Sequence, residues 1–488
     1  MDQFILLPPD GIQPDRMTNP TSEAFMRELW TRQAVSGAAP RDDIKVVDGL
    51  SEGGAKLVEL DEAQRLRLKA EFPGVRVVPL VLYRPALAPR PAIETPPTVS
   101  RVVRKTATQI KVVSENGSPV ANADVIAFTD FANKAGAEGK TDAKGIVSLD
   151  LGRATPAVER LYVYAQKSLW NALLNAVKIT RGYTVSLASI KLDYMDALRF
   201  FYGAAPLTAG QGVRVGVIDT GISAEPDLRI EGGVNTAPGE LPGDFGDNGL
   251  GHGTHVAGII AARGSAPNGI RGLAPGVFLR SYRVFAKGSE TASNYAILKA
   301  LDRAVKDGCD LVNMSLGGQG TVDAATHDAI TYARAHGSLV ICAAGNDSRK
   351  PVGAPARDPL AVAVSAMGRK SAFPPNTTQT GDVQAPFGKD KENFVAGFSN
   401  IGPDIDVIAP GVGIISTVPG GYAVMDGTSM ACPAVTGAAA RLLALNSSIL
   451  SMPRNQQRSD MMARMVYAMT MQMGFGAKYE GQGMIKLV

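Results

Sequence analysis

The sequence predicts an α/β protein whose larger, carboxyl-terminal part contains a mainly parallel sheet with helices on both faces. From about residue 192 onward, short apolar runs alternate with alanine-rich stretches of helical length. Repeated strand and helix order favours a parallel sheet, because each crossover helix returns the chain to the same end of the sheet. The alternating segments are 213–219, 255–263, 294–308, 309–318, 324–337, 338–346, 404–411 and 428–446.

The first 86 residues predict a smaller α+β unit with its own core. Apolar runs with strand periodicity and two amphipathic runs with helical periodicity follow one another in the order β-α-β-β-α-β. This order is typical of the ferredoxin-like split motif. The predicted elements are 4–8, 21–33, 44–50, 55–60, 61–72 and 75–85.

The region between these two parts predicts a linker and a small all-β sandwich. Residues 87–99 are rich in proline, which favours a stiff, extended linker. Residues 100–191 contain several strand-like runs separated by turn sequences such as ENGSP and GKTDAKG, and no catalytic motif. The predicted domains are therefore 1–86, a linker at 87–99, 100–191 and 192–488.

Composition limits the classes of partner and the compartment. The 488 residues carry 50 Lys and Arg against 46 Asp and Glu, a net charge of +4, without a basic block, so we expect neither nucleic acid nor a membrane as partner. Two prolines interrupt the apolar run at the amino terminus, which is unlike a secretory signal. The three scattered cysteines, Cys309, Cys342 and Cys432, favour a reducing compartment. We therefore expect a cytoplasmic protein.

Three polar motifs stand at the ends of predicted strands or the starts of predicted helices. The strand VRVGVID ends in Asp219, the segment GHGTHVAG contains His252 and His255, and GTSMACP places Ser429 at the start of a helix. Functional side chains of open parallel sheets gather where strands end and loops begin. An acid, a histidine and a serine are the groups that acyl transfer by a nucleophilic serine requires.

These motifs resemble the signature segments of the subtilases, in the same chain order of acid, histidine and serine. The segments are VIDTGI, GHGTHVAG, AAGND and GTSMACP. The resemblance implies that Asp219 orients the histidine, that His252 is the general base and acid, and that Ser429 is the nucleophile. It also implies an oxyanion hole made by Asn346 and the Ser429 backbone N–H. His255 is then interpreted as a structural residue of the same helix.

The resemblance, which covers about residues 200–488, also implies a substrate channel. NMSLGG is similar to the family strand beside the primary specificity pocket, where Ser315, Leu316 and Gly317 would contact the substrate backbone. A second wall is expected within AKGSE, with Gly288 as its substrate-binding residue. An extended polypeptide would add between these edges as a β-strand. No charge in these segments fixes the side-chain preference.

No cofactor is required by this chemistry, although calcium is possible. Some subtilases bind calcium in a loop after the histidine helix, and Asp227 aligns with one ligand of that site. The corresponding loop, RGSAPNGIRG, contains no acid and two arginines, which argues against a strong calcium site. Asp227 is therefore a weak metal candidate only.

The amino-terminal unit resembles the inhibitory propeptide of subtilases, particularly in AKLVELDEAQRLRLKAEFPGVRVVPLVLY. The resemblance implies that residues 1–86 act as an intramolecular inhibitor, and we expect them to cap Ser429. The predicted activity is that of a serine endopeptidase that hydrolyses peptide bonds through an acyl-enzyme. Two alternatives stay open: a dedicated processing protease for one partner or peptide, and a catalytically silent recognition scaffold.

Overall fold

A mainly parallel sheet forms the centre of the molecule in the computed structural model, which describes residues 2–13, 19–34, 44–96, 108–152 and 156–487. Within these residues the sheet has nine strands in the order β14-β15-β13-β17-β19-β20-β22-β21, and β23 also pairs with β20. All pairs are parallel except β20 with β22 and β21 with β22. The strands are β13 (Arg214–Asp219), β14 (Ile230–Asn235), β15 (Phe278–Arg283), β17 (Leu311–Met314), β19 (Leu339–Ala343), β20 (Val362–Arg369), β21 (Val383–Phe387), β22 (Asn393–Ala396) and β23 (Val407–Pro410).

Helices cover both faces of this sheet, as the alternating sequence predicts. Helices α4 (His252–Ala261) and α7 (Thr428–Leu445) share one apolar core with Val215 and Val217 of β13. Helices α5 (Asn294–Lys306) and α6 (Ala324–Ala335) share another with Ile218 of the same strand. Because the side chains of a strand alternate between faces, both faces of β13 must be apolar. This explains the unbroken apolar run before Asp219.

Helix α7 is long and apolar enough to cross a membrane by length and composition, but 83% of it is buried inside the protein, as in a core helix. The remaining elements of this part of the chain are short, apart from α9, which has 13 residues. They are α3 (Ala197–Tyr202), α8 (Ser447–Leu450), α9 (Gln456–Ala468), α10 (Ala477–Glu480), the 3₁₀ helices Lys370–Ala372 and Thr378–Asp382, the hairpin β24 (Ile414–Val418) and β25 (Gly421–Met425), and β26 (Thr470–Met471) with β27 (Met484–Ile485).

The amino-terminal unit follows the order predicted from its periodicity. Its four strands form an antiparallel sheet in the order β2-β3-β1-β4. The elements are β1 (Asp2–Leu7), α1 (Pro20–Ala34), β2 (Lys45–Gly49), β3 (Lys56–Leu60), α2 (Glu62–Glu71) and β4 (Arg76–Pro79). Asp61 caps α2 in a reciprocal capping box with Gln64, which fixes where this helix begins.

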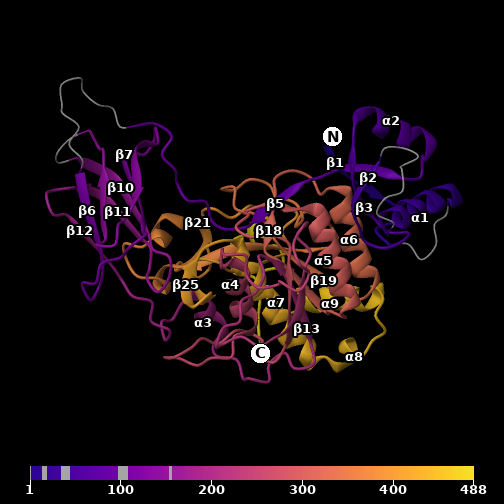
Figure 1. Cartoon of the computed structure of the whole chain (residues 1–488). Coiled ribbons are helices and arrows are strands. Elements are labelled where there is room, and N and C mark those ends of the chain that lie inside the picture. Colours follow the sequence, from indigo (N-terminus) through magenta and orange to yellow (C-terminus); the bar gives the residue numbers. More distant parts are fainter. Residues whose placement is uncertain (1, 14–18, 35–43, 97–107, 153–155, 488) are drawn as a thin grey trace.

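This amino-terminal sheet lies between two sets of helices. Leu6 of β1 belongs to a small core with α1 and α2, whereas Ile5 and Leu7 belong to the core of α5 and α6. Lys299 of α5 pairs with Asp48 at 2.5 Å, and Arg76 pairs with Asp328 of α6. Figure 1 shows the unit beside these two helices. The apolar face that the period-2 pattern predicts for this sheet is therefore covered by α5 and α6.

Residues 108–152 and 156–190 form a β unit of two facing sheets around one apolar core, on the side of the molecule opposite the amino-terminal unit (Figure 1). The sheets have the orders β11-β10-β7-β8 and β12-β6-β9. Strands β8 and β11 are not evident from the sequence, because AGAEGK and ALLNAVK lack strand alternation. The strands are β6 (Thr108–Ser114), β7 (Asp124–Asp130), β8 (Ala135–Lys140), β9 (Ile146–Leu149), β10 (Ala157–Tyr164), β11 (Ala172–Lys178) and β12 (Thr184–Leu187).

The segment predicted as a stiff, extended linker contacts residues on either side of it in the chain. Strand β5 (Leu82–Pro85) ends just before it and pairs with Leu316–Gly317, and the Ala88 N–H donates to the Asp426 carbonyl oxygen at 2.8 Å. Arg90 then lies 4.4 Å from the ring centroid of Tyr164, and Thr95 forms a parallel bridge with Ala135 of the β unit. The last three residues of the predicted linker, 97–99, lie outside the described residues.

Candidate active site

The acid and the histidine predicted from the motifs lie in contact. Asp219 ends β13 and His252 begins α4. The Nδ1 atom of His252 lies 2.7 Å from Asp219 Oδ1, and both side chains are buried. The Thr220 backbone N–H donates to the same carboxylate oxygen at 2.7 Å. At position 253, a Cβ atom would lie 2.3 Å from the Gly221 carbonyl oxygen. Glycine is therefore required for the helix to begin this close to the strand.

The predicted nucleophile stands at the start of α7 and is fully buried. The Ser429 hydroxyl donates to the Ser315 carbonyl oxygen at 2.9 Å. His252 Nε2 is buried and has no hydrogen-bond partner among the described residues. Rotation of the Ser429 side chain toward His252 is therefore needed to complete the triad, a movement common between resting and reacting active sites.

Two hydrogen-bond donors converge on the carbonyl oxygen of Ala86. The Asn346 side-chain oxygen accepts from the Thr428 N–H at 2.9 Å, which turns its amide nitrogen toward the cleft. That nitrogen donates to the Ala86 carbonyl oxygen, which also accepts from the Ser429 N–H at 3.2 Å. Two donors converging on one carbonyl oxygen are the arrangement that stabilises the oxyanion of acyl transfer.

Residues 82–88 occupy the channel as an extended polypeptide. Strand β5 pairs antiparallel with β16 (Ala292–Ser293) on one side and with β18 (Leu316–Gly317) on the other. The Ala86 N–H donates to Ser315 O at 3.1 Å, and the Ala88 N–H donates to Asp426 O at 2.8 Å. The chain therefore passes through the site without a break, and Ala86 contributes the carbonyl group next to Ser429 while Leu87 follows it.

Gly427 explains why the motif before Ser429 begins with glycine. A Cβ atom at this position would lie 2.5 Å from the Ala86 carbonyl oxygen and 3.1 Å from Leu87 Cα. Its φ of 152° is also one that residues with side chains rarely adopt. Any other residue at 427 would collide with a polypeptide bound in the channel.

Comparison with known proteins agrees with this geometry. A model of the subtilase family matches residues 210–481, which is more than half of the chain. The chain belongs to the subtilase family. This membership confirms the resemblance that the four motifs indicate.

Among relatives, the chain is 43% identical to alkaline elastase YaB of Bacillus sp. (strain YaB) over 241 residues, which are 49% of this chain and 56% of the elastase. It is 40% identical over 241 residues to Subtilisin Savinase of Lederbergia lenta, covering 49% of this chain and 79% of that protein. The match to Subtilisin NAT of Bacillus subtilis subsp. natto is 39% over 241 residues, 56% of its length. The chain thus spans little more than half the length of several relatives.

One wall of this subtilase channel lies further along the chain than predicted. Ser315, Leu316 and Gly317 border β5 as expected, but the opposite edge is β16 and not Gly288. Gly288 lies in the preceding turn, has a φ of 68° and donates its N–H to the Asn248 carbonyl oxygen at 2.9 Å. The motif AKGSE lies in the turn, whereas the edge of the channel is formed by the extended residues Ala292–Ser293 that follow it.

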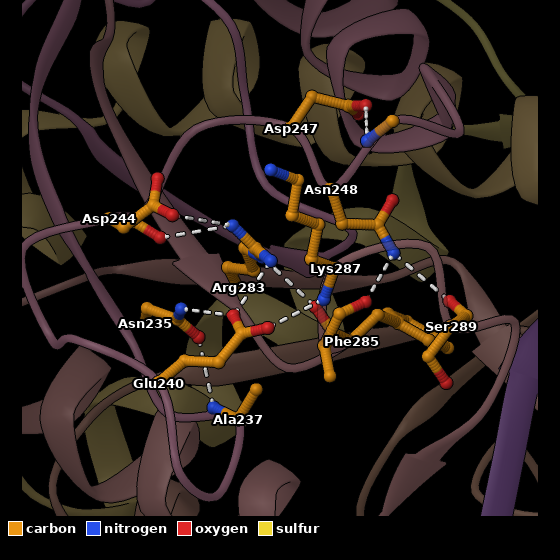
Figure 2. A network of polar contacts seen from close by, with 12 residues as sticks. Asn235, Ala237, Glu240, Asp244, Asp247, Asn248, Arg283, Phe285, Lys287 and Ser289 are labelled. Carbon is orange, nitrogen blue, oxygen red and sulfur yellow. Dashed lines mark hydrogen bonds and ion pairs between the residues drawn. The ribbon is translucent and has the colours of Figure 1, made fainter.

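A buried polar network holds that turn in place (Figure 2). Arg283, which ends β15, is almost fully buried and pairs with Glu240 at 2.7 Å, while Glu240 also accepts from the Lys287 N–H at 2.6 Å. The Asn248 amide donates to the carbonyl oxygens of Ala286 and Ser289, both at 3.0 Å. Sequence reasoning missed these residues, because their partners come from segments about 40 residues apart.

A cavity of about 430 Å³ lies beside Ala86 in the channel. Its wall is made largely of small residues, including Gly317, Gly318, Gly353 and Ala354. Ala86 itself lines this cavity, beside Gly345 and Asn346. The cavity therefore offers space next to the Ala86 side chain for a larger side chain at the same position.

His255 is a structural residue of the same helix as His252. Its ring is fully buried, and Nε2 lies 3.1 Å from the Ile414 carbonyl oxygen and 3.2 Å from the Ala423 carbonyl oxygen of the hairpin β24-β25. Burial, and secondly the charge of a protonated His252, lower the pKa of His255 to about 3. His255 is therefore neutral at neutral pH and joins α4 to this hairpin.

This buried histidine predicts a loss of stability in mild acid. Histidine in the unfolded chain has a pKa near 6.5, so between that value and about 3 the unfolded state binds the additional proton. The free energy of unfolding therefore decreases as the pH falls below about 6.5, by about 2 kcal/mol at pH 5 from this residue. Denaturant unfolding of the Ser429→Ala chain with and without His255→Gln measures this contribution. A difference between the two chains that is equal at pH 7.5 and pH 5 would contradict it.

The residues around Asp227 do not fit a calcium ion. Asp227 Oδ2 accepts from the Ile270 N–H at 2.8 Å and from the Tyr422 hydroxyl at 2.9 Å. Calcium prefers several oxygen ligands, whereas these neighbours present N–H and O–H donors to the carboxylate. Within the described part of the chain, no group of three or more His, Cys, Asp or Glu residues could hold a metal ion. Asp227 is better explained as an anchor for the loop after α4.

Proposed function

We propose that this chain is a serine endopeptidase whose triad is Asp219, His252 and Ser429. Ser429 Oγ attacks the substrate carbonyl carbon while His252 Nε2 takes its proton. His252 then returns the proton to the nitrogen of the leaving peptide, and water hydrolyses the acyl-enzyme by the reverse sequence of proton transfers. Asp219 keeps the Nδ1 proton directed toward itself and stabilises the imidazolium.

One observation carries this proposal: the Ala86 carbonyl oxygen accepts from both Asn346 Nδ2 and the Ser429 N–H. A silent scaffold that binds peptides would need the two channel edges alone. Two donors aimed at one carbonyl oxygen favour a site in which negative charge develops on that oxygen. The substrates we infer are extended or unfolded polypeptides, since their affinity would come from main-chain hydrogen bonds with the two edges.

We also propose that residues 1–86 are an intramolecular inhibitor. Strand β5 fills the channel, and the amino-terminal sheet shares an apolar core with α5 and α6. These contacts hold the segment at a high effective concentration, which favours its occupation of the site over that of a free substrate.

The same register favours self-cleavage between Ala86 and Leu87. Attack by Ser429 would bond its oxygen to the Ala86 carbonyl carbon and release the Leu87 amine, which takes the proton held by His252. Hydrolysis would free an Ala86 carboxylate and regenerate Ser429. The remaining chain would begin at Leu87 and retain the β unit together with the catalytic part.

A serine-directed fluorophosphonate with intact-mass measurement tests the proposal on the full chain. We expect one adduct on a polypeptide that begins at Leu87, together with an unmodified fragment that ends at Ala86. The Ser429→Ala chain should stay full length and unlabelled. The silent scaffold would be favoured instead if the wild type stayed full length and unlabelled, and if a chain without residues 1–86 also took up no label.

A further inference from the structure

Tyr83 is the side chain of the channel-bound segment that is most completely enclosed. Its exposed fraction is 1%, and its ring shares an apolar core with Ala292, Ala296 and Leu316. The hydroxyl group donates to Asp323 Oδ2 at 2.6 Å. Tyr83 is the fourth residue before the bond proposed to be cut, so this pocket binds the side chain at the fourth position of a substrate.

Asp323 is fixed by contacts that do not involve Tyr83. It caps α6, where Oδ1 accepts from the Thr326 N–H at 3.0 Å and Oδ2 accepts from the Thr326 hydroxyl at 2.8 Å. The Asn294 amide donates to Oδ1 at 2.9 Å. The carboxylate is therefore already positioned to accept from a phenol when the channel receives another polypeptide.

Asn294 binds the backbone of the channel segment, whereas Asp323 binds the side chain of Tyr83. The Asn294 N–H donates to Val81 O at 2.8 Å, and its side-chain oxygen accepts from the Val81 N–H at 3.1 Å. These contacts would form with any sequence. The hydrogen bond from Tyr83 to Asp323 requires a side chain that ends in a donor at this depth.

We propose that Asp323 is a specificity-determining residue that selects tyrosine over phenylalanine at the fourth position before the cleaved bond. This inference rests on the proposed endopeptidase function. Phenylalanine fills the same apolar space but removes the phenolic donor from Asp323 Oδ2, which then keeps the Thr326 hydroxyl as its donor among the described residues. A buried, charged oxygen that loses one of its two donors is left partly unsatisfied, so the preference is a penalty on phenylalanine.

The protonation of the phenol is compatible with this role. Burial, followed by the adjacent Asp323 carboxylate, raises the pKa of Tyr83 above its usual value. The hydroxyl group therefore keeps its proton throughout the neutral and alkaline range and remains a donor.

Two peptides that copy residues 83–86 test the selection with the self-cleaved enzyme. They are acetyl-Tyr-Arg-Pro-Ala and acetyl-Phe-Arg-Pro-Ala, each carrying the same fluorogenic amide. We expect kcat/KM to be about tenfold higher for the tyrosine peptide, as one hydrogen bond to a charged acceptor provides. The Asp323→Asn enzyme, which keeps a good helix cap, should cut both peptides within about twofold of each other. A peptide with O-methyltyrosine, which lacks the proton, should be cut no faster than the phenylalanine peptide.

A second measurement is independent of catalysis and uses the full-length Ser429→Ala chain. Hydrogen exchange of residues 82–86 reports how often β5 leaves the channel. We expect Tyr83→Phe to increase this opening about tenfold when Asp323 is present and less than twofold in the Asp323→Asn background. Equal effects in both backgrounds, or equal kcat/KM for the tyrosine and phenylalanine peptides, would overturn the inference. If exchange shows the coupling while neither peptide is cut, the specificity of the pocket stands and the proposed function fails.

Discussion

Replacing His252 with alanine is expected to abolish self-cleavage between Ala86 and Leu87, whereas replacing His255 with glutamine leaves it almost unchanged. The expected loss for His252→Ala is about 10⁶-fold in rate, the size known for removing the base or nucleophile of subtilisin. We expect His255→Gln to stay within about twofold of the wild type. The two histidines lie three residues apart on α4, so the pair provides a matched comparison.

The physical reason is the different environment of each ring. His252 Nδ1 contacts Asp219, and its buried Nε2 has no hydrogen-bond partner among the described residues. His255 uses Nε2 to contact two backbone carbonyl oxygens. Glutamine can still donate one of these hydrogen bonds, so the helix and hairpin should remain in contact.

Intact-mass measurement after dilution from denaturant follows the self-cleavage as a single turnover. The His252→Ala chain should remain full length over days, like the Ser429→Ala control, while the His255→Gln chain shortens with the wild type. Cleavage of His252→Ala at the wild-type rate would mean that another group acts as the base. Cleavage of Ser429→Ala would indicate a contaminating protease and would make the assay invalid.

The candidate triad residues could be predicted from the sequence because each stands within a short motif that also fixes its local structure. Asp219 ends an apolar strand, and glycines permit the close approach of the segments around it. The contact between Asp219 and His252 nevertheless joins residues 33 apart, and no local sequence pattern predicts it. The family resemblance supplied that pairing.

The family resemblance predicts that residues 1–86 cap Ser429, but the segment that enters the channel and its register could not be predicted, because strand pairing between distant segments leaves no local pattern. Leu82–Pro85 reads as the end of an amino-terminal strand, and its partners Ala292 and Leu316 lie more than 200 residues away. The second wall was predicted at Gly288 and not at β16 for the same reason. A turn can be predicted from a local motif, whereas the strand that forms an edge is identified only by the segment with which it pairs.

The region after Ala86 gives the proposed cleavage an unusual consequence. Arg90 pairs with Asp124 at 3.3 Å, and the Glu94 N–H donates to the Lys134 carbonyl oxygen at 3.0 Å. The β unit is in turn hydrogen-bonded to the central part of the molecule, because the Ser168 N–H of the β unit donates to the Tyr422 carbonyl oxygen of β25 at 2.9 Å. The new terminus at Leu87 would therefore stay tethered near the site from which the amino-terminal segment departs.

Replacing Asn346 with leucine is expected to lower kcat by about 10²–10³-fold on the tetrapeptide amides, while KM changes by less than about threefold. The magnitude is that known for the oxyanion-hole asparagine of subtilisin. Asn346 Nδ2 is one of the two donors on the Ala86 carbonyl oxygen. A donor gains most when the carbonyl oxygen becomes an anion, so its loss falls on the chemical step and not on substrate binding.

The Asn346→Asp variant removes the amide donor to the Ala86 carbonyl oxygen but keeps an oxygen that can accept from the Thr428 N–H. An aspartate oxygen can still accept from the Thr428 N–H, which Asn346 Oδ1 accepts at 2.9 Å, but it presents an acceptor to the oxyanion. We therefore expect Asn346→Asp to lose at least as much kcat as Asn346→Leu. If Asn346→Asp kept near wild-type kcat while Asn346→Leu lost it, the residue would act by positioning Thr428 and the helix start. If both variants raised KM and left kcat unchanged, the amide would bind the substrate carbonyl before reaction, and the oxyanion would depend on the Ser429 N–H alone.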